Sequence, residues 1–338
     1  MPVCTGCSLI TDMRAWLERV WFDHAPGGVW LLPLSALFGC MVGLRRLGYR
    51  LGLFYSAHPG KPVVVIGNIT VGGVGKTPLT VWLAEELQAR GWRVGIVTRG
   101  YGGTLTGPVS VTSQSDPRAV GDEPVLLATR TSAQVVVARD RLAGARVLAA
   151  HVDVILADDG LQHYRLRRDV EIAVVDGSRR LGNGRLLPAG PLREPESRLR
   201  EVDLVVVQGV VAGVDSLSMT LLPVAFVDIA TKMRSALGEW RGRTVHAVAG
   251  IGHPARFFCA LKDLGLVVIE HPLADHARIG LEQVTFADRV PVVMTEKDAV
   301  KCRDLPPAAR FYLEVKAMLP MADAERLMAR VISCVSRS

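Results

Sequence analysis

Short hydrophobic runs, each ending in glycine or polar residues, alternate along the chain with segments of helical periodicity. The runs at residues 63–67, 94–98 and 152–157 are rich in Val and Ile and too short for helices, so each is predicted to be a buried strand. Between the first two, apolar positions recur every three to four residues, as at Leu79 and Leu83. This alternation predicts an α/β fold with mostly parallel sheets and helices on both faces.

The pattern continues to the C-terminus and predicts two α/β/α lobes. We predict a helical, membrane-associated N-terminal segment over residues 1–58, a first lobe over 59–209, a linker of short strands over 210–240 and a smaller second lobe over 241–338. Further strands are predicted at 109–111, 135–138, 171–175, 203–208, 245–249, 266–270, 290–295 and 311–315. Helices are predicted from Pro78 to Arg90, from Pro124, over 139–150 and 254–264, and from about Ala322.

A glycine-rich loop joins the first predicted strand to the first predicted helix. Its sequence is Gly-Gly-x-Gly-Lys-Thr, whereas the usual Gly-x-x-x-x-Gly-Lys-[Ser/Thr] pattern has glycine where this chain has Thr70. Inward-pointing N–H groups and the positive end of a helix hold phosphates, and Lys76 and Thr77 add an ammonium group and a hydroxyl. The loop predicts a P-loop site for ATP and Mg²⁺ made by Thr70, Val71, Gly72, Gly73, Val74, Gly75, Lys76, Thr77 and Pro78.

Acidic residues stand beside other predicted elements. Asp158 and Asp159 follow a hydrophobic strand, where nucleotide-binding sheets place a Mg²⁺-holding carboxylate, and a capping or turn role is the alternative. Asp122 and Glu123 directly precede Pro124, at the start of a predicted helix. From their position alone, helix capping is as well supported as a catalytic role.

An uncharged apolar stretch occupies residues 29–44 and is followed by Arg45, Arg46 and Arg50. A membrane-spanning helix needs about 20 apolar residues, and this stretch is shorter and contains proline and glycine. An apolar segment that ends in arginines and aromatic residues is typical of a helix lying in the membrane interface. We therefore predict an interfacial helix, with a single span and an ordinary core helix as the alternatives.

Charge and cysteine content narrow the class of partner. The 338 residues carry a formal net charge of +7, which suits an anionic partner. Because no basic stretch is interleaved with aromatics and no nucleic-acid module is present, we predict a phosphorylated substrate or a membrane and no nucleic acid. The cysteines lack the spacing of a zinc site, and the N-terminus lacks the pattern of a signal peptide, so we predict a cytoplasmic protein with reduced thiols.

Taken together, these motifs resemble those of the tetraacyldisaccharide 4'-kinase family, the lipid A 4'-kinases of Gram-negative bacteria. The matching residues occur in the family's order, between about residues 63 and 301. They are Gly67-Asn68, Val71 to Pro78, Thr98-Arg-Gly-Tyr-Gly102, Gly121-Asp-Glu-Pro124, Asp158-Asp-Gly-Leu-Gln-His163, Gly190-Pro-Leu-Arg-Glu194, Asp275-His276 and Thr295-Glu-Lys-Asp298. Ala277 departs from the second polar residue that follows the histidine in many members.

The resemblance implies a lipid kinase of lipid A biosynthesis. Such a kinase transfers the γ-phosphate of ATP to the 4' hydroxyl of tetraacyldisaccharide 1-phosphate and forms the lipid A precursor lipid IVA. It works at the cytoplasmic face of the bacterial inner membrane, so the expected partners are the lipid A disaccharide precursor and the anionic membrane surface. No obligate protein partner is expected.

The resemblance also implies a role for individual residues. Lys76 stabilises charge on the phosphates, and Thr77 with an aspartate of the 158/159 pair holds Mg²⁺. Asp122, supported by His276, accepts the proton of the sugar hydroxyl. Substrate contacts are implied for Asn68, Arg99, Gln162, His163 and Arg193.

Two other classes of protein remain as alternatives. A ParA-like membrane-associated partitioning or targeting ATPase shares the Gly-Gly-x-Gly-Lys-Thr loop, but those proteins carry a lysine where this chain has Val71. A non-catalytic membrane adaptor would not need the acidic residues after the strands. ATP turnover that depends on a lipid acceptor, rather than on DNA or a partner protein, distinguishes the three.

Overall fold

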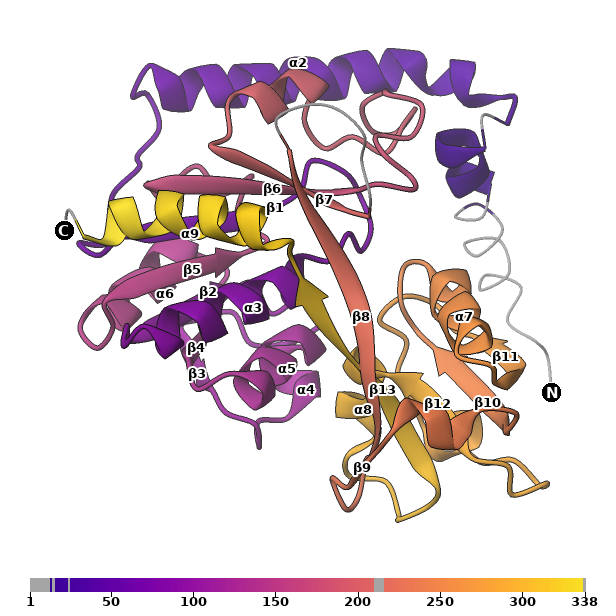
Figure 1. The fold of residues 1–338 in the computed structure, drawn as a ribbon. Helices are drawn as coiled ribbons and strands as arrows, with labels where there is room; N and C mark the ends of the chain where they lie inside the picture. Colours follow the sequence, from indigo (N-terminus) through magenta and orange to yellow (C-terminus); the bar gives the residue numbers. More distant parts are fainter. Residues whose placement is uncertain (1–12, 14–15, 24, 210–215, 337–338) are drawn as a thin grey trace.

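The strands of the chain form one continuous sheet. The computed structural model describes residues 13, 16–23, 25–209 and 216–336. Within them, thirteen strands are connected in the order β11-β10-β12-β13-β8-β7-β6-β1-β5-β2-β4-β3, and β9 pairs with β8 (Figure 1). Their bounds are β1 Val63–Gly67, β2 Val94–Thr98, β3 Val109–Val111, β4 Gln134–Val137, β5 Val154–Asp158, β6 Val170–Asp176, β7 Leu204–Gln208, β8 Leu217–Asp228, β9 Arg234–Ser235, β10 Thr244–Ala249, β11 Val267–Pro272, β12 Val292–Thr295 and β13 Arg310–Met318.

Helices cover the faces of this sheet. The α-helices are α2 Leu32–Arg50, α3 Lys76–Ala89, α4 Pro117–Val120, α5 Asp122–Arg130, α6 Arg141–Ala149, α7 Pro254–Asp263, α8 Glu296–Ala299 and α9 Met321–Val335. The 3-10 helices are η1 Gly28–Leu31, η2 Glu196–Arg200, η3 Leu237–Trp240, η4 Leu281–Gln283 and η5 Val300–Cys302.

The strand β8 joins two lobes. Its residues 217–219 pair in parallel with β7, and residues 220–228 pair antiparallel with β13. We call β1–β7 with α3–α6 the first lobe, and β10–β13 with α7 and α8 the second lobe. Apart from the β3–β4, β8–β9 and β8–β13 pairs, the strand pairings are parallel. The predicted α/β class with mostly parallel sheets is therefore confirmed.

The bounds differ from the predictions at a few elements. α3 begins at Lys76 and α5 at Asp122, each two residues before the proline at which a helix was predicted, because proline is tolerated within the first turn. The short helix α4 was not predicted. In the predicted linker of short strands, β8 is one strand of 12 residues, and residues 210–215 lie outside the described part of the chain.

The core of the first lobe explains why its strands are uniformly apolar. Side chains of a strand alternate between faces: Val64 and Ile66 of β1 belong to the same buried cluster as residues of α3, and Val63 and Val65 to the cluster that includes α6. Because both faces are covered, no position of β1 is left for a polar side chain. β1 and β5 are parallel neighbours, so the loop after β1 and the polar residue Asp158 reach the same edge.

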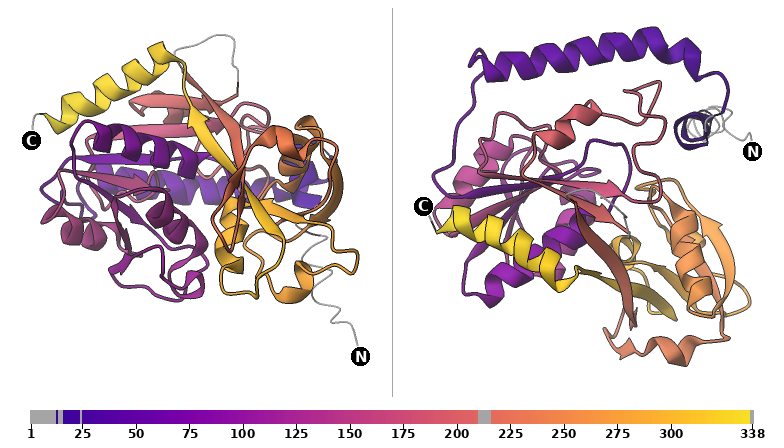
Figure 2. Two further views of the ribbon diagram at one scale, coloured as in Figure 1. Left: turned by 60° about the horizontal axis from the view of Figure 1, so that its bottom comes forward. Right: turned by 45° about the horizontal axis from the view of Figure 1, so that its top comes forward.

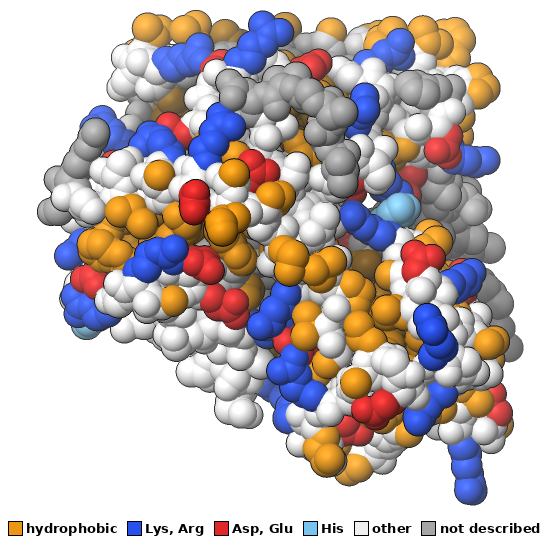
Figure 3. All heavy atoms as spheres, in the orientation of Figure 1, with side chains coloured by type: hydrophobic (Ala, Val, Ile, Leu, Met, Phe, Trp, Pro, Cys, Tyr) orange, Lys and Arg blue, Asp and Glu red, His pale blue; other side chains and the backbone are white. Residues whose placement is uncertain are grey.

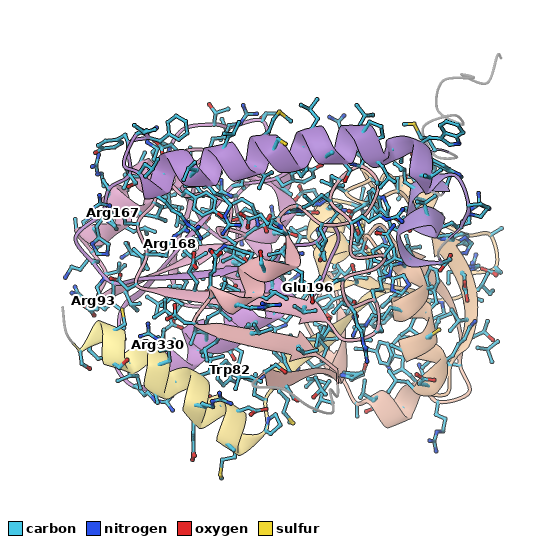
Figure 4. The ribbon with its side chains drawn as sticks, turned by 90° about the horizontal axis from the view of Figure 1, so that it is seen from above. Trp82, Arg93, Arg167, Arg168, Glu196 and Arg330 are labelled. Carbon is cyan, nitrogen blue, oxygen red and sulfur yellow. The ribbon has the colours of Figure 1, made fainter. Side chains whose placement is uncertain are left out.

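The C-terminal helix α9 packs on the first lobe, although the prediction assigned residues 241–338 to the second. Leu327 and Val331 are fully buried in the cluster that contains α3 and β1 residues. Arg330, labelled in Figure 4, donates to Asp203 at 2.6 Å. The reason is the path of the chain. Because β13 pairs along β8, the chain returns to the first lobe, and the apolar side of α9 packs against the sheet there.

The helix α2 forms an outer layer across the first lobe (Figures 1 and 2). Ser35 donates to the carbonyl of Leu186 at 2.8 Å, and Arg46 pairs with Glu201 at 2.5 Å. The helical run Gly28–Arg50 has 23 residues and mean hydropathy 1.5, and is long and apolar enough to cross a membrane by length and composition. The argument that this stretch is too short to span was therefore wrong, because the helix continues through the arginines.

The outward face of α2 is apolar. In the most hydrophobic 18 residues of the helical run Gly28–Arg50, only 11% is buried, which contradicts the alternative of an ordinary core helix. Hydrophobic side chains line the upper edge of the molecule in Figure 3, with basic side chains beside them. The exposed hydrophobic residues of this face are Leu34, Leu37, Met41, Leu44 and Leu47, and Val29 and Trp30 of the preceding η1 are exposed as well.

Candidate active site

A buried asparagine fixes the conformation of the loop after β1. Asn68 is fully buried, and its side-chain amide donates to the carbonyl of Thr70 at 2.8 Å. Its side-chain oxygen accepts from Lys76 Nζ at 3.2 Å, which ties the loop to the start of α3. These contacts give Asn68 a structural role, because they fix the conformation of the loop. A substrate contact of Asn68 stays a prediction.

The glycines leave one side of this loop open. Gly72 and Gly75 have φ of 109° and 89°, a region that favours glycine, and Gly75 directly precedes the first residue of α3. A Cβ built on Gly72 or Gly73 would meet no atom within 4 Å. Free space beside a helix N-terminus is what a phosphate group requires. Thr77 and Pro78 lie in the first turn of α3, as the motif predicts.

Asp158 and Asp159, at the end of β5, face different surroundings. Asp158 is buried and hydrogen-bonded to the Thr80 hydroxyl at 3.2 Å, and burial, followed by the charge of Glu123, raises its pKa to about 7. Asp159, with a left-handed φ of 51°, lies 3.3 Å from Lys76 Nζ. Burial would raise the pKa of Asp159, but the charges of Lys76 and Arg193 outweigh it and lower the pKa to about 2.

These oxygens fit a magnesium ion bound together with phosphates. Asp159 Oδ1 is buried, and its recorded partner among the described residues is the Lys76 ammonium at 3.3 Å, an ion pair without hydrogen-bond geometry. Within the same part of the chain, no group of three or more His, Cys, Asp or Glu forms a complete metal cage. Mg²⁺ is usually held by one or two carboxylates while waters and phosphates supply the other ligands. Asp158, Asp159 and the Thr77 hydroxyl are a donor set of this kind.

The structure brings Asp122 and His276 together from the two lobes. His276, in the loop after β11, places Nδ1 3.3 Å from Asp122 Oδ2. Gly121 is the N-cap of α5 and Asp122 its first residue, so the carboxylate is not the predicted N-cap, although Oδ1 accepts from the backbone N–H of Glu123 at 3.0 Å. Burial would raise the pKa of Asp122, but the contact with His276 and the charge of Lys297 outweigh it and lower the pKa to about 2.

Two lysines complete this cluster, and the sequence analysis assigned neither a role. Lys297 Nζ lies 2.9 Å from Glu123 Oε1 and 3.2 Å from His276 Nε2. Lys301 Nζ lies 3.5 Å from Asp122 Oδ2 and 2.9 Å from the fully buried Asp298. The motif Thr295-Glu-Lys-Asp298 placed Lys297 at the carboxyl end of a predicted strand. The packing of α8 against α5 shows which residues its side chain contacts.

The other predicted substrate residues occupy different environments. Arg193 pairs with Asp159 at 3.5 Å, at the edge of the phosphate loop, and Arg99 is exposed. Gln162 donates to the carbonyl of Asn68 at 2.9 Å, so it supports the loop. His163 faces Asp140 at 3.6 Å, and burial, followed by neighbouring arginine charge, lowers its pKa to about 4. Contacts of these residues with a substrate stay predictions.

A buried arginine behind the aspartate pair was missed by sequence reasoning. The guanidinium of Arg141 donates to the carbonyl of Asp159 at 3.3 Å. It is 5% exposed, and burial lowers its pKa even though Asp159 and Asp158 act in the opposite direction. In the sequence Arg141 is simply the first residue of a surface helix after the N-cap Asp140, so nothing signals its burial.

Comparison with known proteins gives consistent matches across the chain. A family model described as "Tetraacyldisaccharide-1-P 4'-kinase" matches residues 28–333. The tetraacyldisaccharide 4'-kinase of Alkalilimnicola ehrlichii is 50% identical over 329 residues, 95% of this chain and 98% of that protein. The enzyme of the same name from Methylobacillus flagellatus is 47% identical over 320 residues, 94% of this chain and 96% of that protein.

A solved structure matches the fold as well. The "apo" form of LpxK from Aquifex aeolicus in complex with ATP superposes with a TM-score of 0.77 at 28% identity, covering 91% of this chain and 99% of that one. The matches do not support the alternative of a ParA-like ATPase.

Proposed function

We propose that this chain, which belongs to the tetraacyldisaccharide-1-P 4'-kinase family, transfers the γ-phosphate of ATP to the 4' hydroxyl of a tetraacylated glucosamine disaccharide 1-phosphate. The observation that carries the proposal is the convergence of a phosphate-type loop, a carboxylate pair and the Asp122–His276 pair. A Cβ at Gly252 would lie 3.6 Å from both Asp275 Oδ2 and the backbone nitrogen of Gly73, so the loop that carries His276 adjoins the glycine-rich loop. The groups for phosphate binding and for proton transfer therefore share one site.

The loop and its lysine bind the nucleotide. Backbone N–H groups of residues 72–77 surround the phosphates, and Lys76 moves from its contact with Asp159 to the transferring group. Thr77, Asp158 and Asp159 would hold Mg²⁺, and the ion would neutralise negative charge on the phosphates. The ATP bound in the Aquifex aeolicus relative supports the choice of ATP as the nucleotide.

Asp122 orients the acceptor and takes its proton. The proton of the 4' hydroxyl passes to the carboxylate as the oxygen bonds to the γ-phosphorus and the bond from that phosphorus to the β-phosphate oxygen breaks, which releases ADP. A carboxylate whose pKa is about 2 is a weak base, but phosphoryl transfer has a loose transition state in which alignment and charge neutralisation matter more. His276 fixes the direction of the carboxylate. Arg193 and Arg99 contact the sugar or its phosphate.

The lipid acceptor explains the outer helix. We propose that the apolar face of α2 inserts into the cytoplasmic face of the inner membrane, with Arg45 and Arg50 near anionic headgroups. The contacts of Ser35 and Arg46 hold α2 flat against the first lobe. This geometry favours a helix that lies in the interface over one that spans the bilayer.

The test is transfer of radiolabelled phosphate from ATP to a tetraacyldisaccharide 1-phosphate by the purified full chain. We expect lipid-dependent transfer that requires Mg²⁺ and is lost in Lys76→Ala. ATP turnover stimulated by DNA or a protein but not by the lipid would instead identify a partitioning ATPase. Wild-type rates in Lys76→Ala would refute the nucleotide assignment.

A further inference from the structure

A second backbone segment, residues 185–193, holds the first part of the phosphate loop. The N–H of Val71 donates to the carbonyl of Pro191 at 2.9 Å, and the N–H of Arg193 donates to the carbonyl of Ile69 at 2.7 Å. The two hydrogen bonds lie on either side of an antiparallel bridge between the segments. Glycine occupies three of the four positions 72–75 that follow. Because glycine allows many backbone conformations, such a loop depends on its neighbours for one fixed shape.

The segment 185–193 is itself a tight turn. The N–H of Leu187 donates to the carbonyl of Leu192 at 2.9 Å, and the N–H of Leu192 donates to the carbonyl of Arg185 at 3.1 Å. A Cβ on Gly190 would lie 2.3 Å from that Arg185 oxygen, so a side chain at this position would prevent the turn from closing. Since the two ends of the turn are bonded to each other, the position of one end fixes the position of the other.

The helix α2 holds the outer end of this turn at Leu186. The hydroxyl of Ser35, which is 7% exposed, donates to the carbonyl of Leu186 at 2.8 Å. Gly39 lies one helical turn further along the same face of α2, and a Cβ built there would lie 2.9 Å from Leu186 Cδ1. Small residues at both positions therefore let α2 approach the turn closely. Leu186 in turn forms a bridge with Leu192, the residue that pairs with the phosphate loop.

A second contact of α2 reaches the loop by a separate route. Arg45 Nη2 donates to the backbone carbonyl of Gln162 at 3.1 Å. The side chain of Gln162 donates to the carbonyl of Asn68 at 2.9 Å and to Glu194 Oε2 at 3.0 Å. Asn68 is the buried residue that fixes the conformation of the loop. The helix α2 thus acts on the loop at two places.

We propose that α2 positions the phosphate loop through Ser35 and Arg45, so that the helix assigned to the membrane is also a part of the nucleotide site. The inference deepens the proposed function, because it rests on the binding of ATP by this loop. Ser35 and Arg45 contact the residues that hold the loop, and they are positioning residues. Without these contacts the loop must be ordered when ATP binds, and this cost lowers the affinity.

The direct test is calorimetric titration of the full chain with a non-hydrolysable ATP analogue and Mg²⁺, in the absence of lipid. Ser35→Ala and Arg45→Met should each raise the Kd of the analogue by about 3- to 10-fold, as expected for the loss of one hydrogen bond. If either variant binds the analogue with the wild-type Kd, that residue does not position the loop and the proposal is wrong.

Two control variants separate the positioning of the loop from the general attachment of α2. Arg46→Met removes the charge next to Arg45 together with an ion pair to Glu201, which lies outside both routes to the loop. Cys40→Ala changes an exposed position of the same helix. Both should bind the analogue within about twofold of the wild type. If Arg46→Met weakens binding as much as Arg45→Met does, lost charge or loosened attachment explains the effect and the proposal is wrong.

Hydrogen exchange supplies a readout that needs no nucleotide. In Ser35→Ala and Arg45→Met, the amides of residues 68–75 should exchange faster than in the wild type. The amides of β5 should exchange at the wild-type rate, and the unfolding temperature should not change. Unchanged exchange at residues 68–75, or faster exchange throughout the first lobe, overturns the proposal.

Kinetics distinguish positioning of the loop from an effect on the acceptor. In both variants the KM for ATP should rise by a similar factor while kcat stays close to the wild-type value, because saturating ATP orders the loop. A loss of kcat with an unchanged KM for ATP would contradict the proposal.

Failure of the proposed function gives a different pattern. A wild-type protein that binds the ATP analogue but phosphorylates no lipid refutes the kinase assignment, and the calorimetric and exchange results then still decide the role of α2. A wild-type protein that does not bind the analogue refutes both.

Discussion

The pKa values of the two adjacent aspartates in the site are shifted in opposite directions. The pKa is about 7 for Asp158 and about 2 for Asp159. Asp158 is the last residue of β5 and is buried beside Thr80, whereas the left-handed backbone at Asp159 directs its carboxylate to Lys76 and Arg193. Because Asp158 is buried, ionising its carboxylate lowers the stability of the folded protein.

This difference predicts that Asp158→Asn stabilises the nucleotide-free protein at pH 8. The folded-state pKa of Asp158 is raised above its unfolded value, so the folded state binds the extra proton between about pH 4 and pH 7 and loses stability as pH rises through that window. The gain should be on the order of 1–3 kcal/mol at pH 8 and should largely disappear at pH 4. Denaturant unfolding at both pH values measures it.

The same substitution should abolish Mg²⁺-dependent transfer, because the amide removes a charged ligand.

Asp159→Asn is the matched control for stability. The folded pKa of Asp159 is depressed, so Asp159 contributes stability above about pH 4 that is lost as pH falls towards 2, and its amide variant should be less stable at pH 8. Equal effects of the two substitutions would contradict the assigned environments.

The Asp122–His276 contact predicts non-additive kinetics. Asp122→Ala and His276→Ala should each lower kcat by roughly 10²- to 10⁴-fold with little effect on the KM for ATP. Because the two side chains act as one unit, the double variant should be little worse than the poorer single variant. Steady-state transfer assays of all four proteins provide the cycle. Losses that multiply would mean that His276 acts independently, for instance on a lipid phosphate.

Among the elements, α2 has two faces with different roles: the inward face contacts the first lobe, and the outward face is available for membrane attachment. Leu37 and Leu44 are 58% and 68% exposed on its outward face, whereas Ser35 and Arg46 face the first lobe. The outward residues therefore contribute little to the core of the protein. They are available for burial in a membrane.

We predict that Leu37→Glu combined with Leu44→Glu releases the protein from anionic vesicles without lowering its unfolding temperature. High salt should release the wild type only in part, because each basic residue near the surface contributes about 1 kcal/mol and the rest is apolar burial. Vesicle flotation measures binding. Met233→Glu, at a position 72% exposed in the turn between β8 and β9, is the control and should still bind. Complete release of the wild type by salt would exclude apolar insertion.

At the scale of the whole molecule, the lobes are joined by ion pairs across the site. Arg130 of α5 binds Glu296 of α8 at 2.7 Å, with both side chains nearly buried, and also reaches Glu314 of β13. Arg256 of α7 binds Asp176 at 3.2 Å but is 42% exposed. In the second lobe, a Cβ at Gly252 would lie 3.6 Å from the backbone nitrogen of Gly73, so this lobe covers the phosphate loop.

We predict that Arg130→Met loosens the docking of the lobes far more than Arg256→Met. Removing one partner of a buried pair leaves an unpaired charge and costs about 3–5 kcal/mol. An exposed pair contributes about 0–1 kcal/mol. Small-angle scattering should show a larger radius of gyration for Arg130→Met alone, together with lower kcat, since Asp122 and His276 separate. A compact Arg130→Met protein would show that β8 and α9 suffice to fix the lobes.

The local elements could be predicted from the sequence alone, and the glycine-rich loop after β1 could be located in the same way. The apolar runs of β1, β2 and β5 and the glycine spacing at residues 72–75 act over a few residues, so their consequences can be predicted without knowing the rest of the chain. Parallel strands also place loop ends at one edge, which is why the loop and Asp158 could be expected near each other.

Which distant residues meet depends on the tertiary fold and could not be predicted from the sequence. His276 reaches Asp122 and Lys297 reaches Glu123 because β8 and β13 set the second lobe against α5. Arg141 is buried because α6 lies against the end of β5. α9 returns to the first lobe for the same topological reason. Such contacts depend on long-range sheet pairing and on burial, which raise or lower the pKa of each group and which periodicity within a segment does not encode.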